Sequence, residues 1–234
     1  MTEDLELQTY VKISPFQVGI YLYDTKNSKN LYEHELKYEN IKEIVDLNVL
    51  NQLLDQNVFR IEKLLGNFVE NICLVVEDIN HYNISFGIKK KIYENIINKK
   101  YLENLLIEAK DLFNENYQTE KIMHIIIDKY LVDDLSYLSF DDNFVGENFS
   151  LEIQFKSISS SLANDIEKVL EKYHIRISNY VDGNYVKDFF LEENTEFGEM
   201  LFKIINGFNI NEVKLVPKNL RKIGFFEKFF QLFS

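Results

Sequence analysis

Short apolar runs and alternating positions predict strands near the start of the chain. Residues 10–13 (YVKI) and 17–23 (QVGIYLY) have the pattern of extended segments, and Ser14-Pro15 separates them. Proline has no N–H group to donate to a sheet, so this pair marks a bend or an edge. Residues 31–37 (LYEHELK) alternate apolar and polar side chains, which indicates a third strand.

A helical period follows these strands. Apolar residues from Leu47 to Phe68 recur every three or four positions, which predicts an amphipathic helix of about five turns. The run ICLVV at 72–76 predicts a short buried strand. The first part of the chain is therefore predicted to fold in the order β-β-β-α-β.

The middle of the chain predicts a second group of elements, inserted at about 84–160. An extended stretch at 83–93 precedes a helix over Leu102–Phe113, and KIMHIIID at 121–128 and SLEIQF at 150–155 predict two further strands. An acidic loop, DDLSYLSFDDNFVGEN, connects these two strands. After the insertion we expect a helix capped by Ser161 and a strand over HIRIS at 174–178.

The last 17 residues, 218–234, form an amphipathic pattern when they are placed on a helical wheel. One half of the wheel holds the apolar residues Ile223, Phe225, Phe226, Phe229, Phe230, Leu232 and Phe233. The basic residues of the segment are Lys218, Arg221, Lys222 and Lys228, and Glu227 is its single acid. The segment therefore carries +3 in a chain of net charge −12.

This pattern is typical of a helix that lies in a membrane interface. The phenyl rings would lie at the boundary of headgroups and acyl chains, and Arg221, Lys222 and Lys228 would face an anionic lipid surface. Two alternatives are packing of the helix on its own domain and docking into a groove of a partner protein. Pro217 and the basic charge within an acidic chain favour the membrane.

Composition narrows the function classes. A net charge of −12 disfavours a nucleic-acid-binding protein, because phosphate contacts need clustered Lys and Arg. The single cysteine, Cys73, lies within an apolar run and is expected to be a buried core residue. No uncharged apolar stretch is long enough to span a bilayer, and the acidic start MTEDLELQTY differs from a signal peptide. Together these observations predict a cytoplasmic location.

We identify no catalytic or metal-binding pattern. His124 lies within an apolar strand, where a hydrogen-bonded sheet residue is expected, and the acidic loop lacks the ligand order of an EF-hand. No phosphate-binding glycine motif occurs, Gly183 is interpreted as a turn glycine, and Lys89–Lys91 as a solvated strand face. We therefore expect no enzymatic activity, no cofactor and no metal.

The order of elements resembles FtsA, the actin-like bacterial cell-division protein. His124, Tyr130, Asn143, Val145 and Gly146 fit the family pattern of a histidine-x-isoleucine strand followed by an asparagine–proline–valine–glycine turn, with Phe144 in place of the proline. The resemblance covers about 10–180 and the basic, aromatic segment 218–234. The place of the family's first phosphate loop reads ISPFQVG, without its acid and Gly-Thr pair, and the 35 or so residues before 218 leave no room for the second actin-like half.

This resemblance implies an α+β fold, a truncated actin-like (ribonuclease-H-like) half-domain with an inserted strand–helix–strand–strand subdomain and a C-terminal amphipathic helix. The implied organisation is a half-domain over 8–82 and 161–190, an inserted interaction subdomain over 83–160, a linker over 191–217 and a membrane-targeting helix over 218–234.

The resemblance further implies a non-enzymatic adaptor on the cytoplasmic side of the inner membrane, at midcell. It would bind anionic lipid and divisome proteins and would self-associate. FtsZ contact by the usual surface is not expected, since the missing half carries that surface in the family. Two alternatives are an actin-like scaffold of a pilus or secretion assembly, resembling PilM, and a minimal actin-like ATPase.

Overall fold

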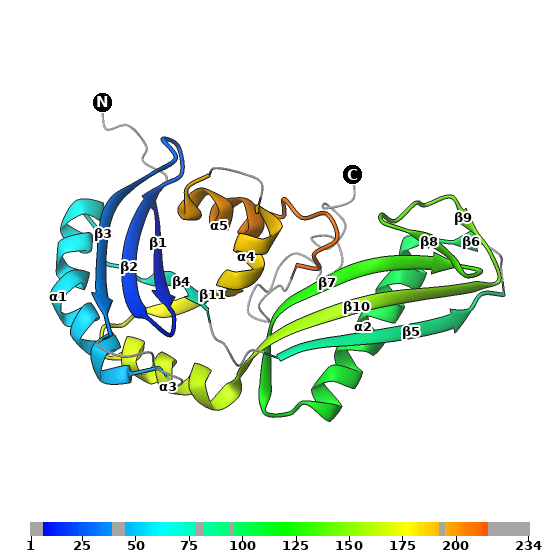
Figure 1. Ribbon diagram of the computed structural model, residues 1–234, viewed down its shortest axis with the longest axis horizontal. Coiled ribbons are helices and arrows are strands. Elements are labelled where there is room, and N and C mark those ends of the chain that lie inside the picture. The colour runs from blue at the N-terminus through cyan, green and yellow to red at the C-terminus, as the bar shows by residue number, and fades with distance from the viewer. Residues whose placement is uncertain (1–6, 39–44, 78–81, 94–95, 192–194, 215–234) are drawn as a thin grey trace. The chain divides into compact units, whose positions relative to one another are not determined.

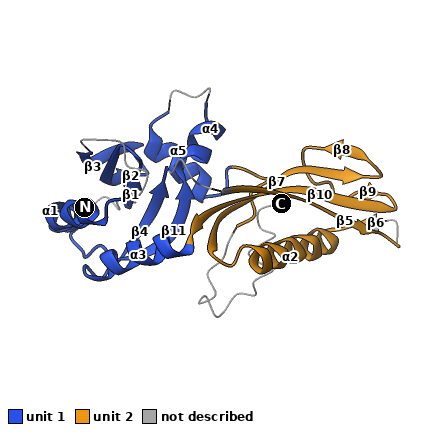
Figure 2. Ribbon diagram, turned by 60° about the horizontal axis from the view of Figure 1, so that its bottom comes forward, with its two compact units in different colours: residues 1–81, 160–208 blue, residues 82–159, 209–234 orange. Residues whose placement is uncertain are grey.

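The computed structural model describes residues 7–38, 45–77, 82–93, 96–191 and 195–214 (Figure 1). The chain divides into two compact units, which Figure 2 shows in blue and orange. Unit 1 comprises residues 1–81 and 160–208, and unit 2 comprises 82–159 and 209–234. Unit 2 therefore contains an insertion into unit 1 together with the C-terminal stretch.

Unit 1 is built on a five-stranded mixed sheet of strand order β11-β4-β1-β2-β3. β1 and β2 are antiparallel, as are β2 and β3, whereas β1, β4 and β11 run parallel. The residues of β2 from Val18 onward are buried, as expected for a strand covered on both faces. The strands are β1 (Leu7–Ile13), β2 (Gln17–Asp24), β3 (Lys29–Lys37), β4 (Asn71–Val76) and β11 (Arg176–Asp182).

Helices cover both faces of this sheet. Figure 1 shows α1 (Leu47–Leu65) and α3 (Ser160–Glu171) on one side and α4 (Gly183–Phe189) and α5 (Phe197–Ile205) on the other. Asp46 caps α1 by accepting from the backbone N–H groups of Asn48 and Val49, and Gly66 ends the helix in the left-handed region at φ 73°. The helix predicted from the 3.6-residue period is thus confirmed, although Phe68 lies beyond its end.

The stretch 191–217, expected to be a linker, contains α5 instead. Leu201 and Ile204 of this helix are buried, and Gly198 approaches the sheet so closely that a Cβ atom would lie 2.4 Å from the Tyr23 ring. Phe197 packs against Tyr10, with ring centroids 6.2 Å apart. The apolar residues of this segment therefore belong to a packed helix of unit 1.

Unit 2 consists of a four-stranded antiparallel sheet with one long helix on one face. Its strand order is β5-β10-β7-β8, and α2 packs its buried residues, from Leu102 to Phe113, against the sheet. The expected strand–helix–strand–strand order is present, with three short strands in addition. The elements are β5 (Tyr82–Lys91), β6 (Ile96–Ile97), α2 (Lys99–Asn116), β7 (Glu120–Val132), β8 (Leu135–Tyr137), β9 (Phe144–Val145) and β10 (Asn148–Ser159).

The turn between β7 and β8 has the backbone of a type I′ hairpin. Asp133 and Asp134 both have positive φ, 47° and 69°. The Asp133 carboxylate accepts from the backbone N–H of Asn148 at 2.8 Å and of Glu147 at 3.1 Å. A Cβ atom on Gly146 would lie 2.5 Å from Val132 Cγ1, so this position needs glycine.

The described fold is therefore mixed α/β, with one mixed and one antiparallel sheet. The acidic stretch after β7 is a short hairpin and a two-stranded ladder of β6 and β9 rather than a plain loop. Gly183 is the first residue of α4 and not a turn glycine, because Asp182 caps this helix directly after β11.

Candidate functional site

The residues predicted to bind the membrane lie outside the described residues. These are Arg221, Lys222, Ile223, Phe225, Phe226, Lys228, Phe229, Phe230, Leu232 and Phe233. The membrane helix stays a prediction.

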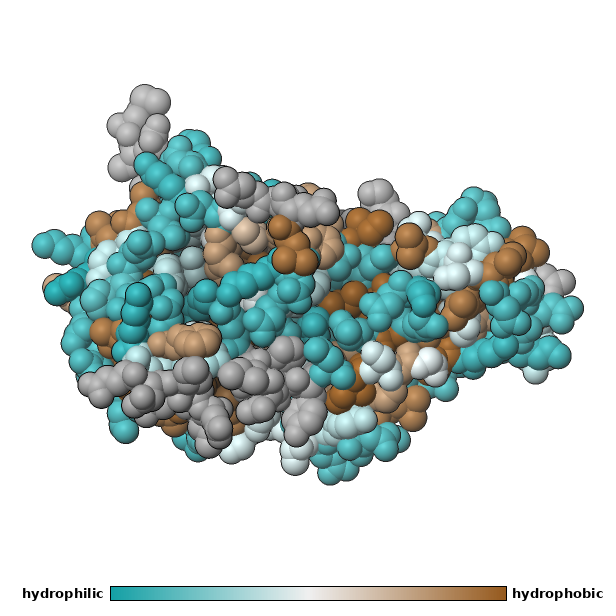
Figure 3. All heavy atoms as spheres, in the orientation of Figure 1, coloured by the Kyte–Doolittle hydropathy of each residue, from teal (hydrophilic) through white to brown (hydrophobic). Residues whose placement is uncertain are grey.

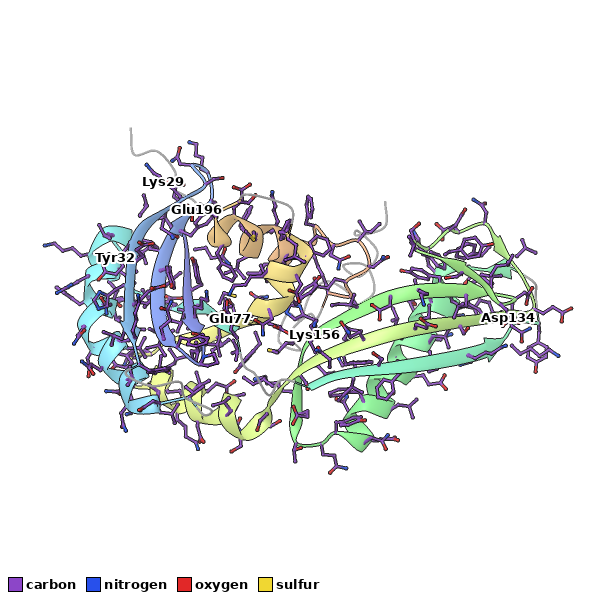
Figure 4. All side chains as sticks on the ribbon, viewed as in Figure 1. Lys29, Tyr32, Glu77, Asp134, Lys156 and Glu196 are labelled. Atoms are coloured by element: carbon purple, nitrogen blue, oxygen red, sulfur yellow. The ribbon has the colours of Figure 1, made fainter. Side chains whose placement is uncertain are left out.

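In open α/β sheets, ligands bind beyond the carboxyl ends of the parallel strands. In unit 1 this edge is formed by the ends of β1, β4 and β11, and it brings together Lys12, Glu77 and Asp182. Glu77 lies directly after β4, and Figure 4 labels it near the start of α4. These residues come from three distant parts of the sequence.

One carboxylate oxygen joins two lysines at this edge. Glu77 Oε1 lies 3.0 Å from Lys12 Nζ and 2.8 Å from Lys187 Nζ, which extends from α4. The side chains of Lys12 and Glu77 are only 15 % and 11 % exposed, whereas Lys187 is 47 % exposed. Lys12 Nζ also lies 4.8 Å from the centroid of the Phe197 ring, in cation–π geometry. The Glu77 carboxylate therefore offsets one of the two lysine charges, and the triad keeps a net charge of +1.

Asp182 has a structural task at the same edge. This fully buried residue accepts through Oδ1 from the backbone N–H groups of Asn184 at 2.8 Å and Tyr185 at 3.1 Å. A Cβ atom on the following Gly183 would lie 2.5 Å from Glu77 Cγ and 2.9 Å from Val75 Cγ1. The start of α4 is thus packed directly on the end of β4.

In the β1–β2 turn, the side chain of Ser14 hydrogen-bonds to the backbone of the turn. The Ser14 hydroxyl oxygen accepts from the backbone N–H groups of Phe16 at 3.3 Å and Gln17 at 3.1 Å. Pro15 has no N–H group. A backbone phosphate cradle needs N–H groups that point at the ligand, and this turn directs two of its N–H groups to Ser14.

In unit 2, His124 is hydrogen-bonded as the sequence predicted. It is 3 % exposed, and its Nδ1 lies 2.5 Å from Glu212 Oε1. Tyr130, the second residue of the family pattern, is fully buried in the core of unit 2, and burial raises the pKa of its hydroxyl. Both residues therefore act in packing. Cys73 is buried in β4 as expected, and burial raises the pKa of its thiol.

Sequence reasoning missed the contact made by residues 209–213, which we name the C-terminal arm. The Ile127 N–H donates to Asn211 O, and the Val213 N–H donates to Ile125 O, both at 2.9 Å. Val213 is 7 % exposed and belongs to the core of unit 2. The arm therefore extends the sheet as a short segment paired with β7. The sequence INEV has too few residues for a strand period to show.

Several large apolar residues reach the surface of unit 2. The most exposed are Tyr93 at 84 %, Leu138 at 75 %, Val145 at 68 % and Leu135 at 64 %. On the face shown in Figure 3, a few hydrophobic residues lie among hydrophilic ones at the end of unit 2 that carries β8 and β9. Lys89 and Lys90 are exposed and lie 3.8 Å from Asp134 and 3.0 Å from Glu108, which agrees with a solvated strand face.

In the described part of the chain, no three His, Cys, Asp or Glu side chains are grouped so that they could hold a metal ion. None of the described helices combines the length and the apolar character that crossing a bilayer requires.

No protein family and no curated protein matches the sequence. Among solved structures, the cytoplasmic domain of EpsL, an inner-membrane component of the type II secretion system of Vibrio cholerae, is 8 % identical, with a TM-score of 0.40 over 77 % of this chain and 59 % of that one. A PilM–PilN type IV pilus biogenesis complex is 9 % identical, with a TM-score of 0.45 over 79 % of this chain and 50 % of that one.

A Bacteroides thetaiotaomicron protein with an actin-like ATPase fold and unknown function is 16 % identical, with a TM-score of 0.32 over 82 % of this chain and 58 % of that one. The chain thus spans between 50 % and 59 % of the length of these three structures.

Proposed function

We propose that this chain is a non-enzymatic scaffold built on one half of an actin-like fold, which binds protein partners beside a membrane. The strand order β3-β2-β1-β4-β11, with an antiparallel hairpin side and a parallel side, is the order expected for the ribonuclease-H-like half. The insertion lies between β4 and α3, where the resemblance to FtsA places an interaction subdomain.

The observation that carries this proposal is the occupied carboxyl edge of unit 1. An actin-like ATPase needs a phosphate loop and free cationic or acidic groups here. In this chain Ser14 takes two N–H groups of the turn, and Lys12 and Lys187 share Glu77. These contacts support a role in which the edge stabilises the fold and the exposed apolar residues of unit 2 bind partners.

Nucleotide titration tests the non-enzymatic part. A ligand that binds only the folded state raises the melting temperature of a protein. Since we expect the chain not to bind nucleotide, adding Mg-ATP to the full chain should give no calorimetric heat of binding and no shift in melting temperature. Mg-GTP is measured in parallel, and an unrelated ATPase confirms that the assay responds. A clear shift that depends on ATP would favour the minimal ATPase instead.

Vesicle binding tests the membrane part. Full-length protein is expected to sediment with vesicles that contain anionic lipid, and a chain that ends at Pro217 is expected to stay in solution. Phe230→Glu should abolish sedimentation, since it places a charge among the phenylalanines of the predicted helix. Gln231→Glu adds the same charge to the polar half and should retain most of the binding. Equal loss with both variants would mean that net charge alone governs binding.

The assembly that the scaffold serves is proposed in two forms. The sequence resemblance is to a cell-division protein, whereas two of the solved structures above are named for secretion and pilus assemblies. Deletion of the gene distinguishes them: filamentous cells indicate division, and a loss of pili or of secretion indicates the second form. A location at midcell follows only from the first form.

A further inference from the structure

The outer edge of the unit 2 sheet is composite. β8 pairs with β7 at residues 130–132, and the C-terminal arm pairs with the same strand at residues 125–127. The side chain of Asn211 donates from Nδ2 to Leu138 O at 2.8 Å, which joins the two segments. The Tyr130 hydroxyl donates to Asn211 Oδ1 at 3.3 Å. β8 and the arm therefore form one border of this sheet, end to end.

Three large aliphatic residues are exposed along this border. Leu135 is 64 % exposed, Leu138 is 75 % exposed and Ile210 is 56 % exposed. We name these three residues the apolar edge. A row of exposed apolar residues at a sheet border is a docking surface or an aggregation hazard unless something covers it.

The charge around the apolar edge is negative. Residues 133–142 contain four aspartates and no lysine or arginine. Lys89 lies 3.8 Å from Asp134 and Lys99 lies 3.5 Å from Asp142, so two lysines offset part of this charge and the balance stays negative. Asp134, which Figure 4 labels at the end of unit 2, has a side chain that is 94 % exposed. A segment that covers this surface should therefore combine an apolar face with basic residues.

We propose that residues 218–234 of the same chain dock on the apolar edge. This segment carries +3 and five phenylalanines. The described chain ends at Lys214, directly after Val213, whose N–H donates to Ile125 O. The segment is thus tethered to the border that it would cover, and tethering favours docking through a high effective concentration.

The lengths match. The arm runs antiparallel to β7, so it ends on the side of Ile125, away from the β7–β8 turn. The three residues 215–217 reach about 10 Å, enough to reverse direction.

A helix of the 17 residues 218–234 is about 25 Å long. The strand from Ile125 to Val132 covers about 23 Å. A helix that returns along the border would therefore pass Ile210, Leu138 and Leu135.

Docking has a consequence for the membrane role, and this second step rests on the proposed function. The phenylalanine face that would cover the apolar edge is the face that would enter lipid. The docked state and the lipid-bound state exclude each other. The apparent affinity for vesicles is therefore the affinity of the undocked chain multiplied by the fraction of chains that are undocked.

Fluorescence quenching tests the docking directly. The chain contains no tryptophan, so Phe230→Trp introduces a single reporter. Cys73 is 1 % exposed, so a nitroxide reagent labels only an introduced cysteine in the folded protein. The label is placed at Leu138→Cys or, in a second variant, at Leu135→Cys. The control is Ser85→Cys, an exposed position on β5 at the opposite border of the same sheet.

We expect the label at either leucine position to quench the Trp emission several-fold, and the label at position 85 to leave it unchanged. Dilution with excess unlabelled wild-type protein should not relieve the quenching. Relief on dilution would show that the segment docks on a second copy, and equal emission in all three variants would show that it does not dock; both results overturn the proposal.

Vesicles separate this proposal from the membrane role. Anionic vesicles should restore the Trp emission, and Leu135→Asp with Leu138→Asp should raise vesicle binding several-fold by releasing the segment. If the quenching is present but vesicles neither bind nor relieve it, docking stands and the membrane anchor fails. If vesicles bind full-length protein that shows no quenching, the anchor stands and docking fails.

Discussion

At the scale of single residues, close contacts at the carboxyl edge of the unit 1 sheet decide how α4 packs on the ends of the strands. Gly183 lets the first turn of α4 lie on the end of β4, and Asp182 caps that turn. Glu77 then lies where Lys12 and Lys187 both reach it. These three charged residues are far apart in sequence, so only the parallel pairing of β1, β4 and β11 reveals the triad.

Gly183→Ala should destabilise the protein by about 1–3 kcal/mol, the usual cost of overpacking. The added Cβ would lie 2.5 Å from Glu77 Cγ and 2.9 Å from Val75 Cγ1. Urea unfolding gives the measurement. Gly87→Ala is the matched control, because a Cβ there meets no atom within 4 Å. A loss at Gly87 equal to that at Gly183 would show that helix and strand propensity, and not contact with β4, decides the result.

Asp133 gives a prediction about pH. The backbone N–H groups of Asn148 and Glu147 donate to its carboxylate and lower its pKa in the folded state. In the unfolded chain, the pKa of an aspartate is about 3.9. The contribution to stability is therefore present above that pH and is lost as the pH falls through the lower, folded-state pKa. Wild type should be more stable than Asp133→Asn at neutral pH, and the difference should shrink below about pH 4.

Urea midpoints of both proteins at pH 7 and in acid provide the test. Asparagine tolerates positive φ, so the substitution keeps the turn. It removes the charge and replaces one of the two carboxylate oxygens that accept from Glu147 by an amide NH2 group. Asp134→Asn is the control in the same turn, since the Asp134 side chain is exposed and lies 3.8 Å from Lys89. A difference between wild type and Asp133→Asn that persists unchanged in acid would contradict the linkage.

At the scale of elements, the sequence predicts long regular segments well and irregular ones poorly. The strand predicted at 121–128 continues to Val132 because a bulge at Asp128 restores the alternation, so that Tyr130 and Val132 still face the core. From the sequence, the polar pair Asp128-Lys129 resembles the end of a strand. The helices α4 and α5 were missed because they are short and their apolar residues alone do not distinguish a packed helix from a linker.

At the scale of the whole molecule, each unit has a core of its own. In unit 2, Phe113 of α2 stacks on Phe155 of β10, with ring centroids 4.8 Å apart, and both side chains are fully buried. In unit 1, Leu53 of α1 is fully buried. The sequence predicted the insertion that separates these cores, but it assigned the C-terminal arm to a linker, since pairing across so many residues leaves no local pattern.

Separate cores predict separate losses of stability. Phe113→Ala should cost about 3–5 kcal/mol, and it should accelerate amide hydrogen exchange in unit 2 while unit 1 stays protected. Leu53→Ala is the matched substitution in unit 1, with a cost of about 2–5 kcal/mol and the reverse pattern of exchange. Native-state exchange followed residue by residue gives the measurement. Equal acceleration in both units by either variant would show a single cooperative fold.

The two ends of the inserted segment 82–159 lie side by side. Tyr82 at the start of β5 pairs with Ser157 near the end of β10. Paired residues of neighbouring strands have Cα atoms about 5 Å apart, a gap that a short peptide can bridge. In evolutionary terms, adjacent ends allow the segment to be inserted at the connection after β4, or replaced by another, with no change in the strand order of the unit 1 sheet. The pairing of the arm with β7 would then be a later addition, which links the inserted segment to the C-terminal part of the chain.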